Sequence, residues 1–174
     1  VITGLPGTLI SVAWSPDGST AYVLASSRFY SFDIEGTETG DPYSVQDASV
    51  MSWRPDGSAA LLAGNGGAVS SFDGQTVYEL STNLSVSTFN AVAWSPDGTT
   101  CLAVGTNGMI VTYDGTRLSA QNIRVKGAMR AFNGVAWHPD GTYALMVGDT
   151  GTVVKYNKDG TFDNNIQSGT VQNL

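Results

Sequence analysis

The chain has 174 residues, with 41% hydrophobic residues, only 13% charged residues and a formal net charge of -7 at pH 7. This composition excludes a disordered, charge-rich chain, and the length allows one substantial core. Eight Lys and Arg residues are too few for a strongly basic face, which argues against nucleic acid as a partner, and no apolar run approaches the roughly 18 residues that span a membrane.

The first residues do not resemble an intact signal peptide, because residues 1–14 lack both a basic segment and a long apolar core. We therefore expect a processed product or an excised part of a longer protein. The single cysteine, Cys101, cannot form an internal disulfide. Abundant Ser, Thr, Asn and Gly with few Lys favour a cell-surface or secreted protein.

Four segments repeat one motif around each tryptophan of the chain: Val12-Ala-Trp-Ser-Pro-Asp-Gly18, Met51-Ser-Trp-Arg-Pro-Asp-Gly57, Val92-Ala-Trp-Ser-Pro-Asp-Gly98 and Val135-Ala-Trp-His-Pro-Asp-Gly141. The tryptophans are 39, 41 and 43 residues apart. In Pro-Asp-Gly, Pro presets φ, Asp bonds nearby backbone and Gly accepts positive φ, so each motif predicts a first strand followed by a hairpin turn.

Three further strands are predicted after each turn. The second is almost wholly apolar and is expected at residues 21–25, 60–64, 101–105 and 144–148. The third ends in an aromatic residue and is expected at 29–32, 68–72, 109–113 and 152–156. The fourth is more variable and is expected near 42–45, 76–80, 116–120 and 161–166. No helical period of 3.6 is present.

A strand repeat of about 40 to 45 residues is typical of β-propeller blades. We therefore predict an all-β fold, a single domain over residues 1–174 with four blades of four antiparallel strands. The expected blades cover residues 9–46, 48–81, 89–121 and 132–166.

In these motifs the chain resembles the WD-repeat β-propellers, whose blades have a similar Val-Ala-Trp-Ser-Pro-Asp-Gly segment. The third strands here end in Phe-Asp, Phe-Asp, Tyr-Asp and Tyr-Asn, where the family has Trp-Asp, and the family's Gly-His pair is absent. The resemblance implies the fold; function must come from the residues, because such propellers serve many unrelated tasks.

Four blades are few for such a ring, which usually has six to eight, and an open half-ring would expose two apolar blade faces. Three arrangements remain open. Two chains can pair into an eight-bladed ring, a longer parent chain can supply further blades, or four blades can close by themselves.

No catalytic, cofactor or metal site is predicted. His138, the only histidine, lies in a turn where the other repeats have Ser15, Arg54 and Ser95, which predicts an exposed, permissive position. Cys101 aligns with alanines and is expected to be a small buried residue. The four repeated aspartates have a turn role, and residues 157–163 lack the regular acidic ligands and closing Glu of a calcium loop.

The loop at residues 121–131 is the most distinctive segment, because Arg124, Lys126 and Arg130 concentrate three of the eight basic residues there. A solvated loop is the ordinary interpretation. The alternative is a contact for an acidic surface or for a partner chain, so these three residues are the candidate partner-binding residues.

The function predicted from the sequence is a non-catalytic propeller that acts as a protein-interaction or structural scaffold. The partner is a protein, including a second copy that completes an eight-bladed ring. One alternative is a carbohydrate-binding propeller that stacks sugars on Tyr43, Tyr78, Phe89 or Phe132, although the matching repeat positions of Phe89 and Phe132 favour the core. The other is part of a larger propeller enzyme.

Overall fold

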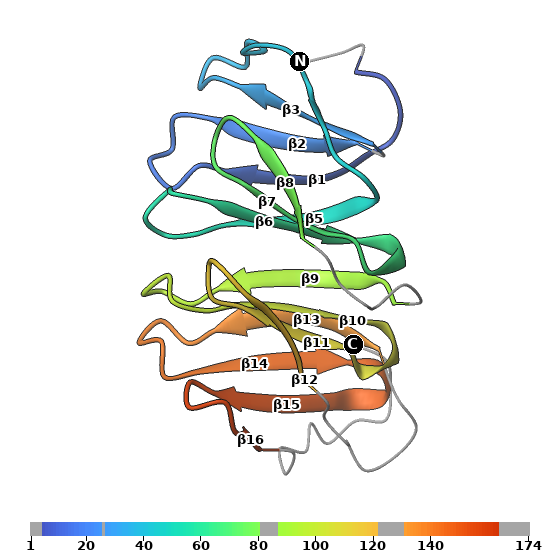
Figure 1. Ribbon diagram of the computed structural model, residues 1–174, viewed down its shortest axis with the longest axis vertical. Coiled ribbons are helices and arrows are strands. Elements are labelled where there is room, and N and C mark those ends of the chain that lie inside the picture. Colours follow the sequence, from blue (N-terminus) through green and yellow to red (C-terminus); the bar gives the residue numbers. More distant parts are fainter. Residues whose placement is uncertain (1–4, 26, 81–86, 122–130, 164–174) are drawn as a thin grey trace.

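In the computed structural model, residues 5–25, 27–80, 87–121 and 131–163 are described. They form four antiparallel sheets of four strands each, and in every sheet the strands lie side by side in chain order (Figure 1). The predicted all-β fold with four four-stranded sheets is confirmed. Within the part of the chain that the structure describes, no helix has the length and hydropathy needed to cross a membrane.

The strands lie within about two residues of where the repeat predicts them, and residues 164–166 of the last predicted strand lie outside the described residues. The first sheet contains β1 (Leu9–Trp14), β2 (Ala21–Ala25), β3 (Arg28–Phe32) and β4 (Tyr43–Ser44). The second contains β5 (Ala48–Trp53), β6 (Ala60–Gly64), β7 (Val69–Phe72) and β8 (Val77–Leu80). The third contains β9 (Phe89–Trp94), β10 (Cys101–Gly105), β11 (Ile110–Tyr113) and β12 (Leu118–Gln121). The fourth contains β13 (Phe132–Trp137), β14 (Tyr143–Gly148), β15 (Thr152–Asn157) and β16 (Phe162–Asp163).

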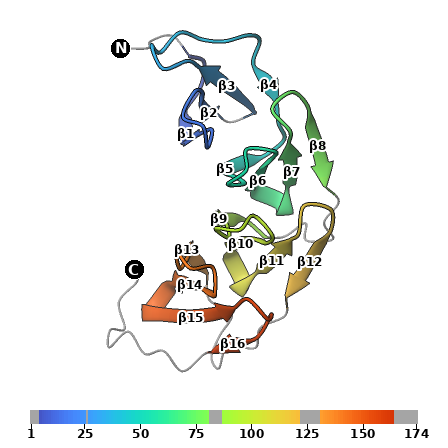
Figure 2. The ribbon, with the colours of Figure 1, turned by 90° about the vertical axis from the view of Figure 1, so that its left-hand side faces the viewer.

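The sheets pack face to face like propeller blades. Seen from the side they form an arc, with β1, β5, β9 and β13 on its inner side and the fourth strands on its outer side (Figure 2). The first and fourth sheets lie at opposite ends of this row in both views (Figures 1 and 2), and among the described residues no closure of a ring is seen.

The second strand of each inner sheet is buried on both faces. All five residues of β6 and all five of β10 are buried, because each of these strands lies between two neighbouring sheets. The fourth sheet, at one end of the row, differs, since Leu145 of β14 is 37% exposed whereas its counterparts Leu61 and Leu102 are fully buried. The apolar composition of the second strands therefore reflects a position between sheets, as the sequence predicts.

Each pair of neighbouring sheets shares a hydrophobic cluster. Between the first and second sheets, Tyr22, Leu24 and Phe29 pack with Leu62 and Phe72. The second and third sheets share a cluster built around Leu61, Phe89 and Cys101, and the third and fourth share one built around Leu102, Phe132 and Met146. The core is thus divided into layers, one for each interface between sheets.

The turns between second and third strands in the last three sheets are short 3₁₀ turns: η1 (Asn65–Gly67), η2 (Thr106–Gly108) and η3 (Asp149–Gly151). The middle residue of each has positive φ, and so does the glycine that follows it. The glycine-rich segment at residues 64–67 is therefore a hairpin turn, as expected from its place between two strands.

Candidate functional site

The Pro-Asp-Gly turns all lie along one edge of the molecule and share one geometry. In each turn the Asp side chain accepts a hydrogen bond from the backbone N–H two residues later, at 3.0 Å for Asp17, 2.9 Å for Asp56, 3.1 Å for Asp97 and 2.9 Å for Asp140. The following glycines have φ between 68° and 74°. The predicted structural role of these four aspartates is confirmed.

These hydrogen bonds stabilise the charged form of the aspartates. The Thr142 hydroxyl and backbone N–H lower the pKa of Asp140 to about 2, with a smaller effect from His138. The Lys158 ammonium, followed by the Ser95 hydroxyl, holds the pKa of Asp97 well below its usual range. Hydroxyls of Ser15 and Ser58 are the main cause of the lowered pKa of Asp17 and of Asp56 respectively. Donors to a carboxylate favour its ionised form.

Acidification is therefore expected to destabilise the fold below about pH 4. Unfolded aspartate has a pKa of about 3.9, whereas folded Asp140 titrates near 2. As pH falls through this window the unfolded chain takes up protons first, so the stability that the turns contribute above pH 4 is progressively lost. Urea unfolding at pH 7, 4 and 2.5 checks this. Asp140→Asn should lose less stability on acidification than the unmodified chain; equal losses would contradict the assignment.

The residue before each proline is not uniformly exposed, which corrects one expectation. His138 is 41% exposed, its Nδ1 lies 2.8 Å from Asp140 Oδ1, and its ring stacks on Tyr143. Ser95, however, is fully buried, and Arg54 reaches the next sheet to donate a hydrogen bond from Nε to the Gly98 carbonyl oxygen at 2.8 Å. The position varies because its side chain meets a different neighbour in each sheet.

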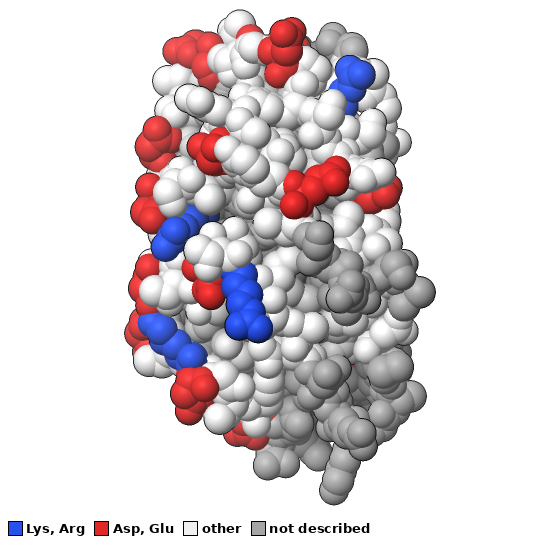
Figure 3. Space-filling view, viewed as in Figure 1, with Lys and Arg blue, Asp and Glu red and all other residues white. Residues whose placement is uncertain are grey.

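Acidic side chains gather along this turn edge, with basic ones between them (left edge of Figure 3, where Figure 1 shows the hairpin turns). The cations of the edge include Arg54 and Lys158. Arg54 lies 3.4 Å from Asp56 and Lys158 pairs with Asp97 of the neighbouring sheet. The edge is therefore an acidic surface. One cation lies at the boundary between the second and third sheets, and another at the boundary between the third and fourth.

A second candidate surface is the face of the first sheet that points away from the second sheet. Leu9 is 51% exposed, although its repeat counterparts Phe89 and Phe132 are buried against the preceding sheet. Trp14 is 53% exposed, whereas Trp94 at the same repeat position is 7% exposed. Val12, between them in β1, is 63% exposed. We call Leu9, Val12 and Trp14 the open face.

Only part of this outer side is covered. Leu5 packs against the buried residues Ala21, Ala25, Tyr30 and Phe32 of β2 and β3. The open face on β1 is left exposed to solvent. An apolar patch of this kind on a sheet commonly marks a protein contact.

The basic candidates Arg124, Lys126 and Arg130 lie outside the described residues, so their role as partner contacts stays a prediction. Cys101 is fully buried, as predicted, and burial raises the pKa of its thiol well above the ordinary value. Among the residues that the structure describes, no group of three or more His, Cys, Asp or Glu side chains could hold a metal ion.

The aromatic residues proposed for sugar stacking do not form one surface. Phe89 and Phe132 are buried in different interfaces, as their matching positions predict. Tyr43 stacks on Phe29 with ring centroids 4.7 Å apart, and the Tyr78 hydroxyl donates to Asp73 at 3.1 Å. Only Tyr78 is largely exposed among the four.

Comparison with known families gives a match over part of the chain. Residues 69–114 match the WD domain, G-beta repeat (WD40) family, so the chain contains a WD40 repeat, as its motifs suggest. The match begins in β7 and ends just after β11, which means that the sequence repeat includes strands from two neighbouring sheets. No curated protein matches the chain. WD40 repeats typically serve as protein-interaction scaffolds and are usually non-catalytic.

Proposed function

We propose that this chain is a non-catalytic scaffold that binds protein, with residues 1–174 acting as one propeller domain. The observation that supports this function is the open face of the first sheet. In the other three sheets the residues at these repeat positions are buried or partly buried, and they pack in the clusters shared with a preceding sheet. A face with this pattern fits the opposite face of another blade.

The partner that fits best is a second copy of the chain. At the other end of the arc, Leu145 and Ala136 are both exposed. Leu61 and Leu102, the repeat counterparts of Leu145, are buried against a following sheet. At the boundary between the third and fourth sheets, Trp137 Nε1 donates to the Ala93 carbonyl oxygen of the preceding sheet at 3.2 Å, whereas Trp53 and Trp94 Nε1 make no such bond among the described residues. In a pair of copies, Trp14 can make the same bond to Ala136 of the second copy, and two such contacts complete an eight-bladed ring.

Light scattering over a concentration series tests this partner. We expect a species near twice the chain mass of 18.2 kDa. Leu9→Glu or Leu145→Glu should weaken self-association by about 30-fold or more, because each places a charge in a desolvated contact. Tyr78→Glu is the matched control, since Tyr78 is 51% exposed on β8 of the second sheet, which has a neighbouring sheet on either side. A monomer at all concentrations, or equal association by all variants, would overturn the second copy as the partner.

A further inference from the structure

Along the turn edge, the three boundaries between neighbouring sheets are built from comparable residues, and we call the site at each boundary a groove whether it is open or filled. Each groove lies between the Pro-Asp-Gly turn of one sheet and the tryptophan and turns of the next. The walls repeat: the tryptophans are Trp53, Trp94 and Trp137, and the glycines that follow the aspartates are Gly57, Gly98 and Gly141. We number the grooves in chain order.

The second groove is filled by an arginine of the chain itself. The guanidinium carbon of Arg54 lies 5.5 Å from the centre of the Trp94 ring, and Nε donates to the Gly98 carbonyl oxygen at 2.8 Å. Gly98 leaves room for the guanidinium, because a Cβ there would lie only 3.1 Å from Nε, and Gly115 lies on the other side, where a Cβ would be 3.6 Å from an Nη atom, in ordinary van der Waals contact. Asp56 lies 3.4 Å from Nε and neutralises the charge.

The third groove obtains its cation from the opposite side. Its first wall has the small Ser95 where the second groove has Arg54. The fourth sheet instead supplies Lys158, at the repeat position of Gly115, and its ammonium pairs with Asp97. In both grooves, therefore, one cation pairs with the aspartate of the Pro-Asp-Gly turn that forms the first wall.

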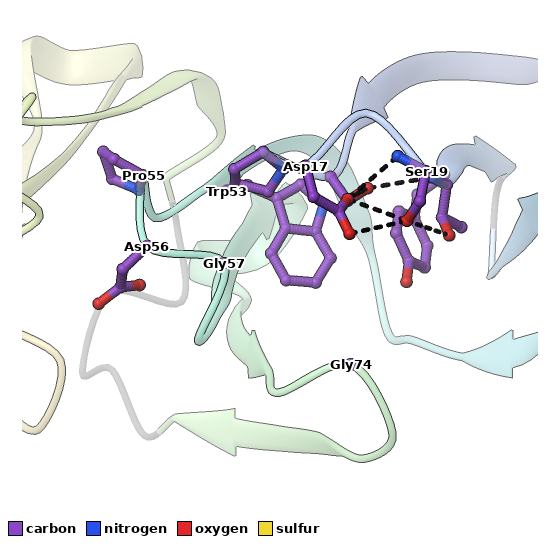
Figure 4. Close-up of a pocket in the computed structure, with 11 residues that line it drawn as sticks. Asp17, Ser19, Trp53, Pro55, Asp56, Gly57 and Gly74 are labelled. Atoms are coloured by element: carbon purple, nitrogen blue, oxygen red, sulfur yellow. Dashed lines mark hydrogen bonds between the residues drawn. The ribbon is translucent and has the colours of Figure 1, made fainter. Parts of the chain in front are cut away.

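The first groove has the same walls and no cation from either side. Ser15 stands at the position of Arg54, and Gly74 stands at the position of Lys158. The space that these residues leave is a pocket of about 530 Å³, lined by Asp17, Trp53, Gly57 and Gly74 among others. In Figure 4 the Trp53 ring lies between the turn of Pro55, Asp56 and Gly57 and the turn of Asp17 and Ser19.

The chemistry of this pocket is that of a guanidinium site. Trp53 corresponds to Trp94, Gly57 to Gly98, Gly74 to Gly115 and Asp17 to Asp56, so every group that contacts Arg54 has a counterpart. Tyr22 adds a second aromatic ring, with its centroid 5.2 Å from that of Trp53, where the next two sheets have leucine. Within the described part of the chain, Asp17 accepts hydrogen bonds from Ser15 and Ser19 at Oδ1 and from Ser19 alone at Oδ2, and each carboxylate oxygen has about two acceptor positions.

We propose that the first groove binds the guanidinium of an arginine side chain presented by a protein partner. The guanidinium lies over Trp53, donates to the Gly57 carbonyl oxygen and pairs with Asp17, as Arg54 does one sheet further along. Planar guanidinium suits this combination of an aromatic face, a carbonyl and a carboxylate. That the arginine belongs to a protein rests on the proposed scaffold function; the recognition of guanidinium does not.

The test uses N-acetyl-arginine N-methylamide as the probe and the indole N–H signals of the four tryptophans in NMR as the readout. We expect the Trp53 signal to shift with one saturable site, and the blocked citrulline analogue, which is isosteric and uncharged, to bind at least about tenfold more weakly. Ser15→Arg should fill the groove and weaken probe binding by a similar factor. Ile34→Arg adds the same charge at an exposed residue that does not line the pocket and should bind the probe normally.

Arg54→Ser is the complementary variant, because it empties the second groove. The Trp94 signal should then also shift with the probe, giving two sites in place of one. Equal binding of the citrulline and arginine probes, equal or tighter binding of blocked lysine, or no effect of Ser15→Arg would each overturn the guanidinium site.

Light scattering on the same samples separates this site from the proposed ring. If the chain is monomeric and the Trp53 signal still shifts on addition of the arginine probe, the guanidinium site is supported and the second copy as partner is overturned. If the chain dimerises and the Trp53 signal does not shift with the probe, the second copy is supported and the guanidinium site is overturned.

Discussion

Replacement of Phe72 by alanine is expected to lower the free energy of unfolding by about 3–5 kcal/mol. Phe72 is fully buried at the boundary of the first and second sheets. Its ring centroid lies 4.9 Å from Phe29 and 4.7 Å from Tyr43 of the first sheet, and 5.7 Å from Trp53 of its own sheet. Alanine would leave a cavity between rings that come from different sheets and cannot all collapse into it.

Urea unfolding followed by tryptophan fluorescence measures this loss, with Phe72→Leu as the conservative variant and a smaller loss expected. Ile34→Ala is the matched control, because the same kind of truncation at a residue that is 69% exposed should change stability by no more than about 0.5 kcal/mol. A loss below about 1 kcal/mol for Phe72→Ala would mean that the first sheet is not held to the second by this cluster.

The strands could be predicted from the sequence because the pattern of each strand occurs four times, once in every repeat. A single apolar run such as residues 101–105 is ambiguous between strand and buried helix, but its alignment with 60–64 and the turn before it remove the ambiguity. The burial of Cys101, Phe89 and Phe132 followed from the same alignment. Repetition supplied the register that local propensity alone leaves open.

The groove cations could not be predicted in the same way. The variation among Ser15, Arg54, Ser95 and His138 indicated a permissive surface position, because an alignment of repeats compares each sheet with the others and says nothing of contacts between sheets. Arg54 acts on Trp94 of the next sheet, and Lys158 acts on Asp97 of the preceding one. The sequence did contain a signal for the second groove, namely a basic residue before one proline and glycines at 98 and 115. This signal can be recognised only when neighbouring repeats are placed side by side in space.

The open face also required the structure. Trp14 and Trp94 are equivalent in the sequence, and only the position of a sheet at the end of the arc makes one exposed and the other buried. The basic loop was distinctive by charge, yet Arg124, Lys126 and Arg130 lie outside the described residues and their role stays a prediction.

Gly105→Ala is expected to cost about 3 kcal/mol or more, or to prevent folding altogether. Gly105 ends β10 beside a register irregularity in its pairing with β9. A Cβ at this residue would overlap the Thr88 carbonyl oxygen and lie 2.8 Å from the Phe89 Cα atom. Both obstacles are backbone, so relief requires the first strand of the third sheet to move, and Phe89 is fully buried in the interface with the second sheet.

Gly134→Ala provides the matched control, because there the nearest atom to a new Cβ is Val147 Cγ2 at 3.3 Å, which a side chain can relieve by a small shift. The loss of unfolding free energy for Gly134→Ala should stay below about 1 kcal/mol on urea unfolding.

Gly64→Ala should behave like Gly105→Ala, since its Cβ would meet backbone atoms of residues 47–49 in the second sheet. The first sheet has Ala25 at this repeat position, and Ala25 pairs with Leu9 of the open face. If Gly105→Ala folds with unchanged stability, β9 can shift relative to β10, and the close approach of these two strands does not depend on glycine at this position.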